Sequence, residues 1–431
     1  MRLTVFDPEL NFECHSCGNC CTRPWRIVVE DEKVEAIREF DWAAKYPQLA
    51  RVQLVDSDEV TGATQYVLAK AEDGACVFFN RANNRCIIHS ELGADAKPHI
   101  CGKYPYGVSN APDADRVFVR FSCPSVQAGR GPTLDKQKDA IEKILKPTAG
   151  WEGNYVQLTH GHDICVESCG LLCDRLAELF DGKNNGDLWE RFAGAIELVN
   201  AAGKCEGGQL DRSLRDSGFG RVEGGTVITG YASPRQSPLT PRMLLGITLW
   251  NDFFPADSLG RKVGFRKRIS MIMKLLQIVQ MRSTYASRFL GMNVPLARLG
   301  AGALAAPLPQ ASSDLLRRWI RSRIIARSFA ISGLTFTAGT HELVLDFNAV
   351  LFLARSRAAG TNAPPTEAMY AEALSIIESR VTAQRRPYRA LFPAWTLGAL
   401  DSPDAARLSL RLFHPDAPVP KEATAAQTAT V

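Results

Sequence analysis

The sequence lacks the short motifs that identify the commonest enzyme classes. Its 431 residues contain no P-loop, no G-x-S-x-G nucleophile motif and no H-E-x-x-H metalloprotease motif. The phosphate-binding loop, serine nucleophile and helical zinc ligands of those classes therefore give no starting point. No internal repeat or long low-complexity tract is visible either, which argues against solenoid and propeller folds.

Long apolar runs are also lacking. The best candidate, 299–308, is short, rich in Gly and Ala and preceded by Arg298, whereas a transmembrane helix needs about 20 apolar residues. The first ten residues contain neither the apolar core nor the cleavage site of a signal peptide. We therefore expect a cytoplasmic protein with no membrane partner.

Charge of either sign is moderate. The chain has 51 Lys and Arg against 46 Asp and Glu, a net charge of +5, which alone does not indicate nucleic acid. Basic residues cluster at 261–268 and 317–323, and an apolar stripe of Ile269, Met273 and Leu276 lies on the other side of the first predicted helix. Such clusters are typical of solvated helix faces, so we expect no nucleic-acid partner.

Cysteine is what the chain has in excess. Four of its 12 cysteines, Cys14, Cys17, Cys20 and Cys21, fall within eight residues. Two-residue gaps let successive sulfurs point at one centre, as in ferredoxin-type iron–sulfur runs, and zinc sites also use C-x2-C pairs. In a reducing compartment this quartet favours metal binding over disulfides.

Four further cysteines lie in the N-terminal third. Cys76 stands in Gly-Ala-Cys-Val-Phe, Cys86 in Cys-Ile-Ile-His, Cys101 in Pro-His-Ile-Cys and Cys123 in Cys-Pro. With the quartet, these segments resemble the eight-cysteine CxxCxxCC family of zinc- or iron-chelating domains over roughly residues 12–130. The family often has arginine where this chain has Gly102. The resemblance implies eight metal ligands: Cys14, Cys17, Cys20, Cys21, Cys76, Cys86, Cys101 and Cys123.

Eight thiolates can hold metal in several ways, which the sequence leaves open. They fit two four-ligand centres that share the quartet, one four-iron cluster with spare thiols, or zinc at one or two sites. Side chains of neighbours such as Cys20 and Cys21 tend to diverge, which disfavours a common face of one centre. The triplet spacing and the Cys123-Pro124 pair favour a 4Fe-4S iron–sulfur cluster over zinc, although soft thiolates suit both metals.

A second hypothesis comes from a weaker resemblance. The CxxCxxCC family is related to flagellin lysine-N-methylase, and residues 316–355 are similar to its helical continuation. This implies a protein lysine N-methylase that uses S-adenosylmethionine and a flagellin-like protein substrate, so whether the chain is an enzyme stays open. The one Gly-rich candidate for the cofactor loop, 300–305, lacks the preceding strand that such a loop needs.

Residue patterns predict the α+β class: a small cysteine-rich α+β metal-binding domain followed by a mostly α-helical region. Strands are expected around the cysteines, at 26–30, 65–69 and 116–121, and helices from residue 164 onward. The expected domains are a cysteine-cluster domain at 1–150, a connecting region at 151–240, an all-helical region at 241–414 and a disordered tail at 415–431.

For three later cysteines and one later aspartate, we expect structural roles rather than metal binding or catalysis. Cys165, Cys169 and Cys173 are spaced four apart on the apolar stripe of a helix predicted over 164–180, so core packing is favoured. Asp346 stands in an apolar helix with Glu342 and His341 close by. We expect a polar helix edge there rather than a catalytic dyad.

Overall fold

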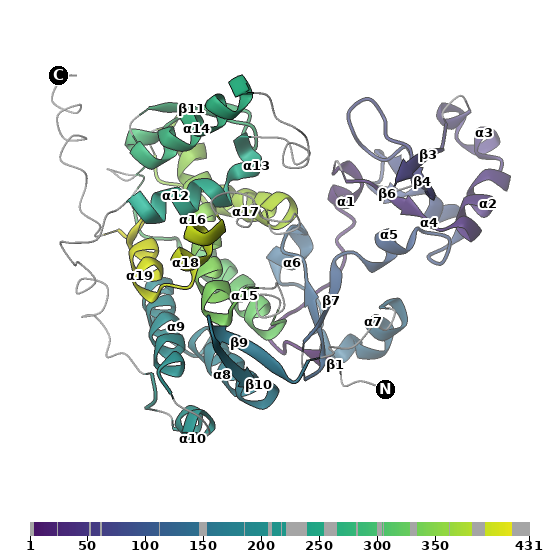
Figure 1. The fold of residues 1–431 in the computed structure, drawn as a ribbon. Coiled ribbons are helices and arrows are strands. Elements are labelled where there is room, and N and C mark those ends of the chain that lie inside the picture. The colour runs from purple at the N-terminus through teal and green to yellow at the C-terminus, as the bar shows by residue number, and fades with distance from the viewer. Residues whose placement is uncertain are drawn as a thin grey trace. The chain divides into compact units, whose positions relative to one another are not determined.

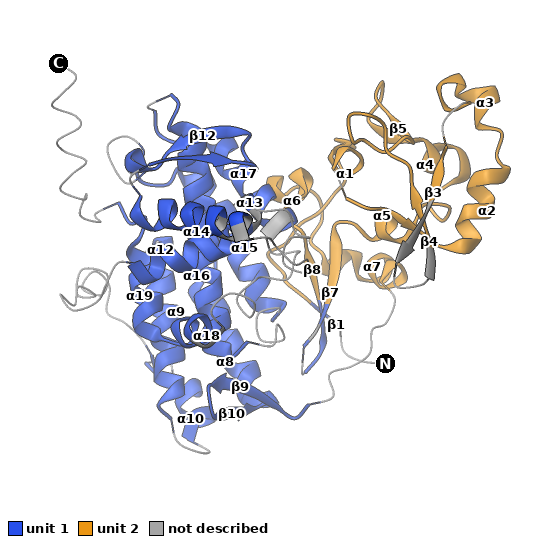
Figure 2. Cartoon of the chain, turned by 45° about the horizontal axis from the view of Figure 1, so that its top comes forward, with its two compact units in different colours: residues 1–5, 109–116, 149–431 blue, residues 6–108, 117–148 orange. Residues whose placement is uncertain are grey.

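The structure is a computed structural model, and its chain divides into two compact units (Figures 1 and 2). Unit 1 comprises residues 1–5, 109–116 and 149–431, and unit 2 comprises 6–108 and 117–148. Small sheets in the N-terminal part and a mostly helical remainder confirm the predicted α+β class. The structure describes residues 4–23, 25–50, 53–60, 63–111, 113–145, 153–184, 186–205, 209–216, 218–220, 239–253, 265–281, 283–299, 304, 306–327, 334–361, 363–381 and 393–415.

Unit 2 combines short strands with short helices. One antiparallel sheet has the order β2-β4-β3, and β5 pairs with β6. The strands are β2 (Val28–Val29), β3 (Val55–Val60), β4 (Ala63–Leu68), β5 (Phe79–Asn80) and β6 (Arg85–Cys86). The helices are α1 (Asn19–Thr22), α2 (Asp31–Glu39), α3 (Trp42–Lys45), η1 (Pro47–Leu49), α4 (Ile87–Leu92), α5 (His99–Lys103), α6 (Pro124–Ala128), η2 (Asp135–Gln137) and α7 (Lys138–Ile144).

The core of unit 2 forms where α2 and α4 bury their apolar residues against the sheet. Acidic residues open α2 and Arg38 closes it, which suits the helix dipole. Val34 and Ile37, three residues apart on one face, are buried there. They join a cluster that includes Trp42, Phe78 and the thiol of Cys76. Cys21, Cys86 and Cys101 pack against the same cluster, so four of the eight metal-ligand candidates stand in or beside this core.

The boundary between the units runs through three strands, β1 (Thr4–Phe6), β7 (Tyr106–Asn110) and β8 (Asp115–Val119), which form a sheet in the order β1-β8-β7. The strands predicted at 26–30, 65–69 and 116–121 are confirmed as β2, β4 and β8, with shifted ends. The domain boundaries expected inside 151–414 stay a prediction. The expected tail, apart from Pro415, and the string at 300–305, apart from Leu304, lie outside the described residues.

Unit 1 is mostly helical, with two hairpins, β9 (Tyr155–Thr159) with β10 (His162–Cys165) and β11 (Thr284–Ser287) with β12 (Met292–Pro295). Its helices are α8 (Val166–Leu179), α9 (Leu188–Gly203), α10 (Gln209–Arg215), α12 (Leu239–Thr248), α13 (Trp250–Phe253), α14 (Phe265–Gln280), η4 (Leu296–Arg298), α15 (Gln310–Ile325), α16 (Phe336–Ala358), α17 (Glu367–Ile376), η6 (Ile377–Val381), α18 (Pro393–Leu400) and α19 (Pro403–Arg411). No described helix has the length and apolar character needed to span a bilayer.

Helix α16 forms the centre of unit 1. It contacts α9, α12, α17 and α19, and nearly all of its residues are buried (Figure 1). Asp346 is fully buried and pairs with Arg323 of α15. The expectation that Asp346 forms a polar edge is therefore wrong, because the helix is surrounded on all sides and its carboxylate has a buried partner.

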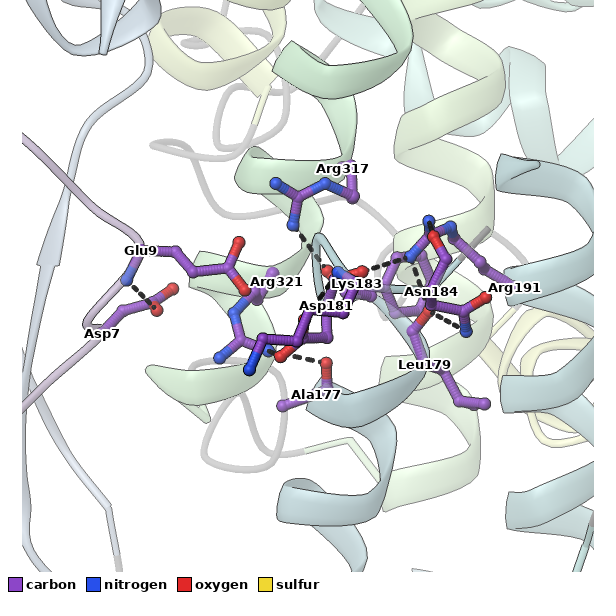
Figure 3. A network of polar contacts seen from close by, with 11 residues as sticks. Asp7, Glu9, Ala177, Leu179, Asp181, Lys183, Asn184, Arg191, Arg317 and Arg321 are labelled. Carbon is purple, nitrogen blue, oxygen red and sulfur yellow. Dashed lines mark hydrogen bonds and ion pairs between the residues drawn. The ribbon is translucent and has the colours of Figure 1, made fainter. Parts of the chain in front are cut away.

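Two arginines of α15, Arg317 and Arg321, bind backbone carbonyls at the end of α8 (Figure 3). Arg321 donates to the carbonyl of Ala177 at 2.8 Å, and Arg317 donates at 2.8 Å to the carbonyl that follows α8. Arg191 donates to the carbonyl of Leu179 at 2.9 Å. The last carbonyls of a helix have few intrahelical donors. These guanidinium groups donate to carbonyls at the end of α8, and that of Ala177 also accepts from the backbone N–H of Phe180. The solvated face expected at 317–323 is therefore wrong.

Candidate metal centre

The quartet lies on a tight loop that ends in the single-turn helix α1. Gly18 stands at the turn with φ of +70°, a conformation that costs glycine nothing. The backbone N–H of Cys21 donates to the carbonyl of Gly18 at 2.8 Å. A Cβ on Gly18 would clash with the ring of Phe79 in β5. The loop therefore needs glycine twice, for the backbone angle and for its close packing.

Four segments of unit 2 bring a group of five thiols together. The N–H of Cys76 donates to the carbonyl of Cys21 at 2.8 Å, which ties the segment before β5 to the quartet. Cys86 faces Phe79 across the β5–β6 pair, and Cys101 lies in α5. These side chains pack in or against one hydrophobic cluster. We call Cys20, Cys21, Cys76, Cys86 and Cys101 the five-thiol group, because each interacts electrostatically with others of the set.

Burial and hydrogen bonding give these thiols very different proton affinities. A hydrogen bond from Cys21, together with the nearby positive charge of Lys97, lowers the pKa of Cys20 to about 6. The same hydrogen bond raises the pKa of Cys21. Burial raises the pKa of Cys76 to about 11 and that of Cys101 to about 12. Cys20 is therefore the member of the group that most readily forms a thiolate.

Two lysines lie within electrostatic reach of the five-thiol group. Lys97 acts on Cys20 and Cys101, and Lys70 acts on Cys76, in each case favouring the thiolate. Four thiolates around a divalent metal carry net negative charge, which these cations would offset. Neither lysine could be identified as a site residue from the sequence alone. The only sequence signal is that Lys97 precedes Cys101 by four residues, which becomes meaningful once α5 is known to lie beside the group.

Cys14, Cys17 and Cys123 form a separate set, the three-thiol group. The backbone N–H of the residue after Cys14 donates to Oγ of Ser125 at 3.1 Å, which holds the loop beside the start of α6. Burial raises the pKa of Cys123, and Cys17 adds to that rise. Cys14 and Cys17 are exposed, whereas Cys123 is buried. The adjacent cysteines Cys20 and Cys21 therefore fall in the same group, and the division runs through the quartet between Cys17 and Cys20.

The donor set suits a soft metal, although its side chains are gathered rather than fully converged. The interacting donors are thiols, which bind zinc and iron–sulfur clusters well, and no carboxylate is among the groups that shift their pKa values. Within the described part of the chain, no group of three or more His, Cys, Asp or Glu side chains is placed so that it could hold a metal ion. Metal binding would therefore require these thiol side chains to turn inward.

The cysteines of α8 have a different environment. Cys169 and Cys173 are 0% and 1% exposed and lie among the buried apolar residues of that helix. Cys165 precedes α8, and its sulfur lies 3.0 Å from Oγ of Ser168. Core packing, the interpretation favoured by the four-residue spacing, is confirmed for Cys169 and Cys173.

Comparisons with known proteins agree with the cysteine pattern. Residues 13–120 match the model of the CxxCxxCC family, described as "Putative zinc- or iron-chelating domain". An uncharacterized protein of Methanocaldococcus jannaschii is 26% identical over 139 residues, which cover 31% of this chain and 44% of the relative. The match thus spans less than half of that relative's length. No solved structure matches the chain. The resemblance to the family is confirmed for its N-terminal part, and it supports metal binding there.

Proposed function

We propose that unit 2 is a thiolate metal-binding domain whose main centre is the five-thiol group. The observation that carries this proposal is the meeting of five cysteines from four separate segments, four of which lie in or against one hydrophobic cluster. Core packing alone does not account for thiols that remain partly exposed, as Cys20, Cys21, Cys86 and Cys101 do. A metal bound there joins α1, β6 and α5, so its binding energy stabilises the fold of unit 2.

An iron–sulfur cluster of the 4Fe-4S type is the preferred occupant, with zinc as the alternative. The all-thiol donor set suits either. The C-x2-C-x2-C spacing and the Cys123-Pro124 pair favour iron–sulfur for the domain as a whole, although Cys14, Cys17 and Cys123 belong to the three-thiol group. Aromatic residues around the site support the same choice, because a shielded environment stabilises a cluster and sets its potential. Phe78 is fully buried, and Trp25 packs edge-on against Tyr104 with ring centroids 4.9 Å apart.

The three-thiol group is proposed as a second, independent ligand set. Its thiols are held by the α6 region rather than by β5 and β6. Three protein thiols leave one position of a four-coordinate centre open, which is the arrangement of a reactive rather than a purely structural site. This assignment uses all eight cysteines. It gives the adjacent residues Cys20 and Cys21 to one centre, the five-thiol group.

Paired substitutions test the proposal, because one lost thiol of five can be replaced by a neighbour. Cys76→Ser with Cys101→Ser leaves three thiols in the main group, one fewer than a closed four-coordinate centre needs, so metal there should be bound much less tightly. Loss of affinity should exceed the roughly 10–100-fold cost of losing an outer-shell partner. Cys14→Ser with Cys17→Ser should spare the main centre. The matched control is Cys165→Ser with Cys205→Ser, and unchanged metal in all three variants would reject the assignment.

The second hypothesis, a protein lysine N-methylase, stays a prediction from the resemblance. A lysine substrate needs an acidic, partly buried pocket that holds its amine. A pocket of about 550 Å³ in unit 1 is lined by Arg175, Arg215 and Glu178 together with apolar residues, and two arginines beside one glutamate do not favour an incoming ammonium. Transfer of a labelled methyl group from S-adenosylmethionine to flagellin, measured on reduced anaerobic protein, decides the question.

A further inference from the structure

Helix α14 presents an apolar face to solvent. Ile269, Ile272, Met273 and Leu276 follow the i, i+3, i+4, i+7 pattern of one helix face. They are 45%, 54%, 56% and 41% exposed. Elsewhere in the described residues, each exposed large apolar side chain stands alone on its element. The sequence analysis read this stripe as the apolar side of a solvated helix, whereas the structure exposes it.

A neighbouring face of α14 is buried in unit 1, which holds the helix in place and leaves the apolar face outward. Leu275, Ile278 and Val279 are buried on a neighbouring face, and α14 packs against α12 (Figure 1). A Cβ on Gly246 of α12 would lie 2.5 Å from the Leu275 side chain, so glycine permits the close approach of the two helices. Arg242 of α12 donates to the carbonyl of Val279 at 3.3 Å.

The sequence around this face is strongly basic. Residues 258–313 contain no Asp or Glu, although the chain as a whole carries nearly equal numbers of acidic and basic residues. Arg266 is exposed in the first turn of α14. The segment contains nine basic residues: Arg261, Lys262, Arg266, Lys267, Arg268, Lys274, Arg282, Arg288 and Arg298.

We propose that α14 docks on an anionic lipid surface. A helix with an apolar face and basic flanks lies in the plane of the bilayer interface, with its apolar side chains among the acyl chains and its cations against the headgroups. Each Lys or Arg near an anionic leaflet adds attraction that decays over the Debye length. Docking in this plane needs no membrane-spanning helix. A second copy of the chain is the poorer occupant, because two equally basic segments would repel each other.

Vesicle sedimentation of the full, metal-loaded chain tests the proposal. The chain should pellet with vesicles of phosphatidylcholine containing about one third phosphatidylglycerol, and at least about tenfold less with phosphatidylcholine alone or in high salt. Ile272→Glu with Met273→Glu should reduce binding about tenfold or more, and Arg266→Glu about fivefold. Tyr155→Glu, at a side chain that is 65% exposed on β9, is the matched control and should bind normally.

Folding and self-association are checked on the same samples. Circular dichroism and metal content should be the same for all variants, because the substituted residues are exposed in unit 1. Equal binding to neutral vesicles, no binding to anionic ones, or full binding by the double variant would overturn the proposal. It would also be overturned if sedimentation equilibrium showed a wild-type dimer that the double variant loses, since the face would then join two copies.

Discussion

The thiols of unit 2 and those of α8 are the same chemical group placed in two different ways. In unit 2 the thiols come from separate segments. A hydrogen bond from the backbone N–H of Cys76 to the carbonyl of Cys21 helps to bring these segments together. On α8, Cys169 and Cys173 come from a single helix and are almost fully buried. Metal ligation requires convergence from several segments, whereas core packing requires only burial. The position of the thiols in the fold therefore separates the two roles better than their number does.

The positive charges near the thiols also differ between the two regions. Lys97 and Lys70 favour thiolates in the five-thiol group. Beside the α8 thiols, Arg327 and Arg116 are both paired with Asp113. Their charge is thus already compensated within unit 1, and little of it is left to stabilise a thiolate. The comparison leads to experiments in which one region should respond and the other should not.

Metal removal should separate the two regions most strongly. Chelation under anaerobic, reducing conditions should cost unit 2 on the order of 10 kcal/mol of apparent stability, because metal-binding energy is folding energy in small metal domains. Hydrogen exchange should show lost amide protection in β4 and retained protection in α16. Metal readdition should restore β4. Equal loss in both elements would mean that the centre does not belong to unit 2 alone.

Acid should act on unit 1 through the buried His341 of α16. Burial lowers the pKa of His341 to about 4, and its ring contacts the carbonyl of Leu400 and, at 2.8 Å, Oγ of Ser409. As the pH falls from about 6.5 to 4, His341 binds a proton in the unfolded chain but not in the folded chain. This difference by itself lowers the free energy of unfolding of unit 1 by about 3 kcal/mol. Hydrogen exchange of α16 at several pH values measures this loss.

The matched variant for that experiment is His341→Gln, which keeps a polar side chain without a proton to gain. Asp252, whose pKa burial raises to about 6, takes up its proton in the folded state over the same range and partly offsets the loss. The informative quantity is therefore the difference between wild type and variant. Identical pH slopes for the two proteins would contradict this account, because His341 would then bind its proton equally in the folded and the unfolded chain.

Cys173→Ser should destabilise unit 1 and leave metal binding intact. A hydroxyl in place of the buried thiol, which is 1% exposed, should cost about 2 kcal/mol unless it finds a partner. Cys205→Ser is the control, because that half-buried side chain lies at the end of α9. Denaturant unfolding and metal analysis give the two readouts, and reduced metal in Cys173→Ser would place α8 in the metal site.

The difference in stability between Gly18→Ala and Gly74→Ala should be the smallest of these effects. Both glycines have positive φ, +70° and +80°, but only a Cβ at Gly18 would meet Phe79. Each variant should lose about 1 kcal/mol to backbone strain. Gly18→Ala should lose about 1–2 kcal/mol more from overpacking and should also bind metal less tightly. Equal losses would show that the quartet loop does not pack on β5.

Much of the candidate site could be predicted from local sequence. The two-residue spacing of the quartet and the four-residue spacing on α8 are local patterns, and both gave the right element or family. The division between Cys17 and Cys20 could not be predicted, because it depends on the pairing of Phe79 with Cys86 and on the contact of the loop with Ser125. Those pairings join residues far apart in the chain.

The charged residues of unit 1 were mispredicted for a related reason. Arg321 and Asp346 were expected at solvated positions, since a charged side chain is buried only when it has a partner. Arg321 binds a backbone carbonyl of α8. Asp346 pairs with a side chain of another helix, α15. Neither partner is close in sequence. Element type was thus predictable, whereas burial of charge depended on long-range packing.

Metal content with a visible spectrum, recorded on anaerobically purified full chain, tests the central claim most directly. The account predicts bound metal on unit 2, with broad visible absorption and iron and sulfide in cluster ratio for the preferred occupant, and with stoichiometric zinc for the alternative. Cys76→Ser with Cys101→Ser should remove most of that signal. A colourless protein free of zinc and iron, with unit 2 still folded, would contradict the account.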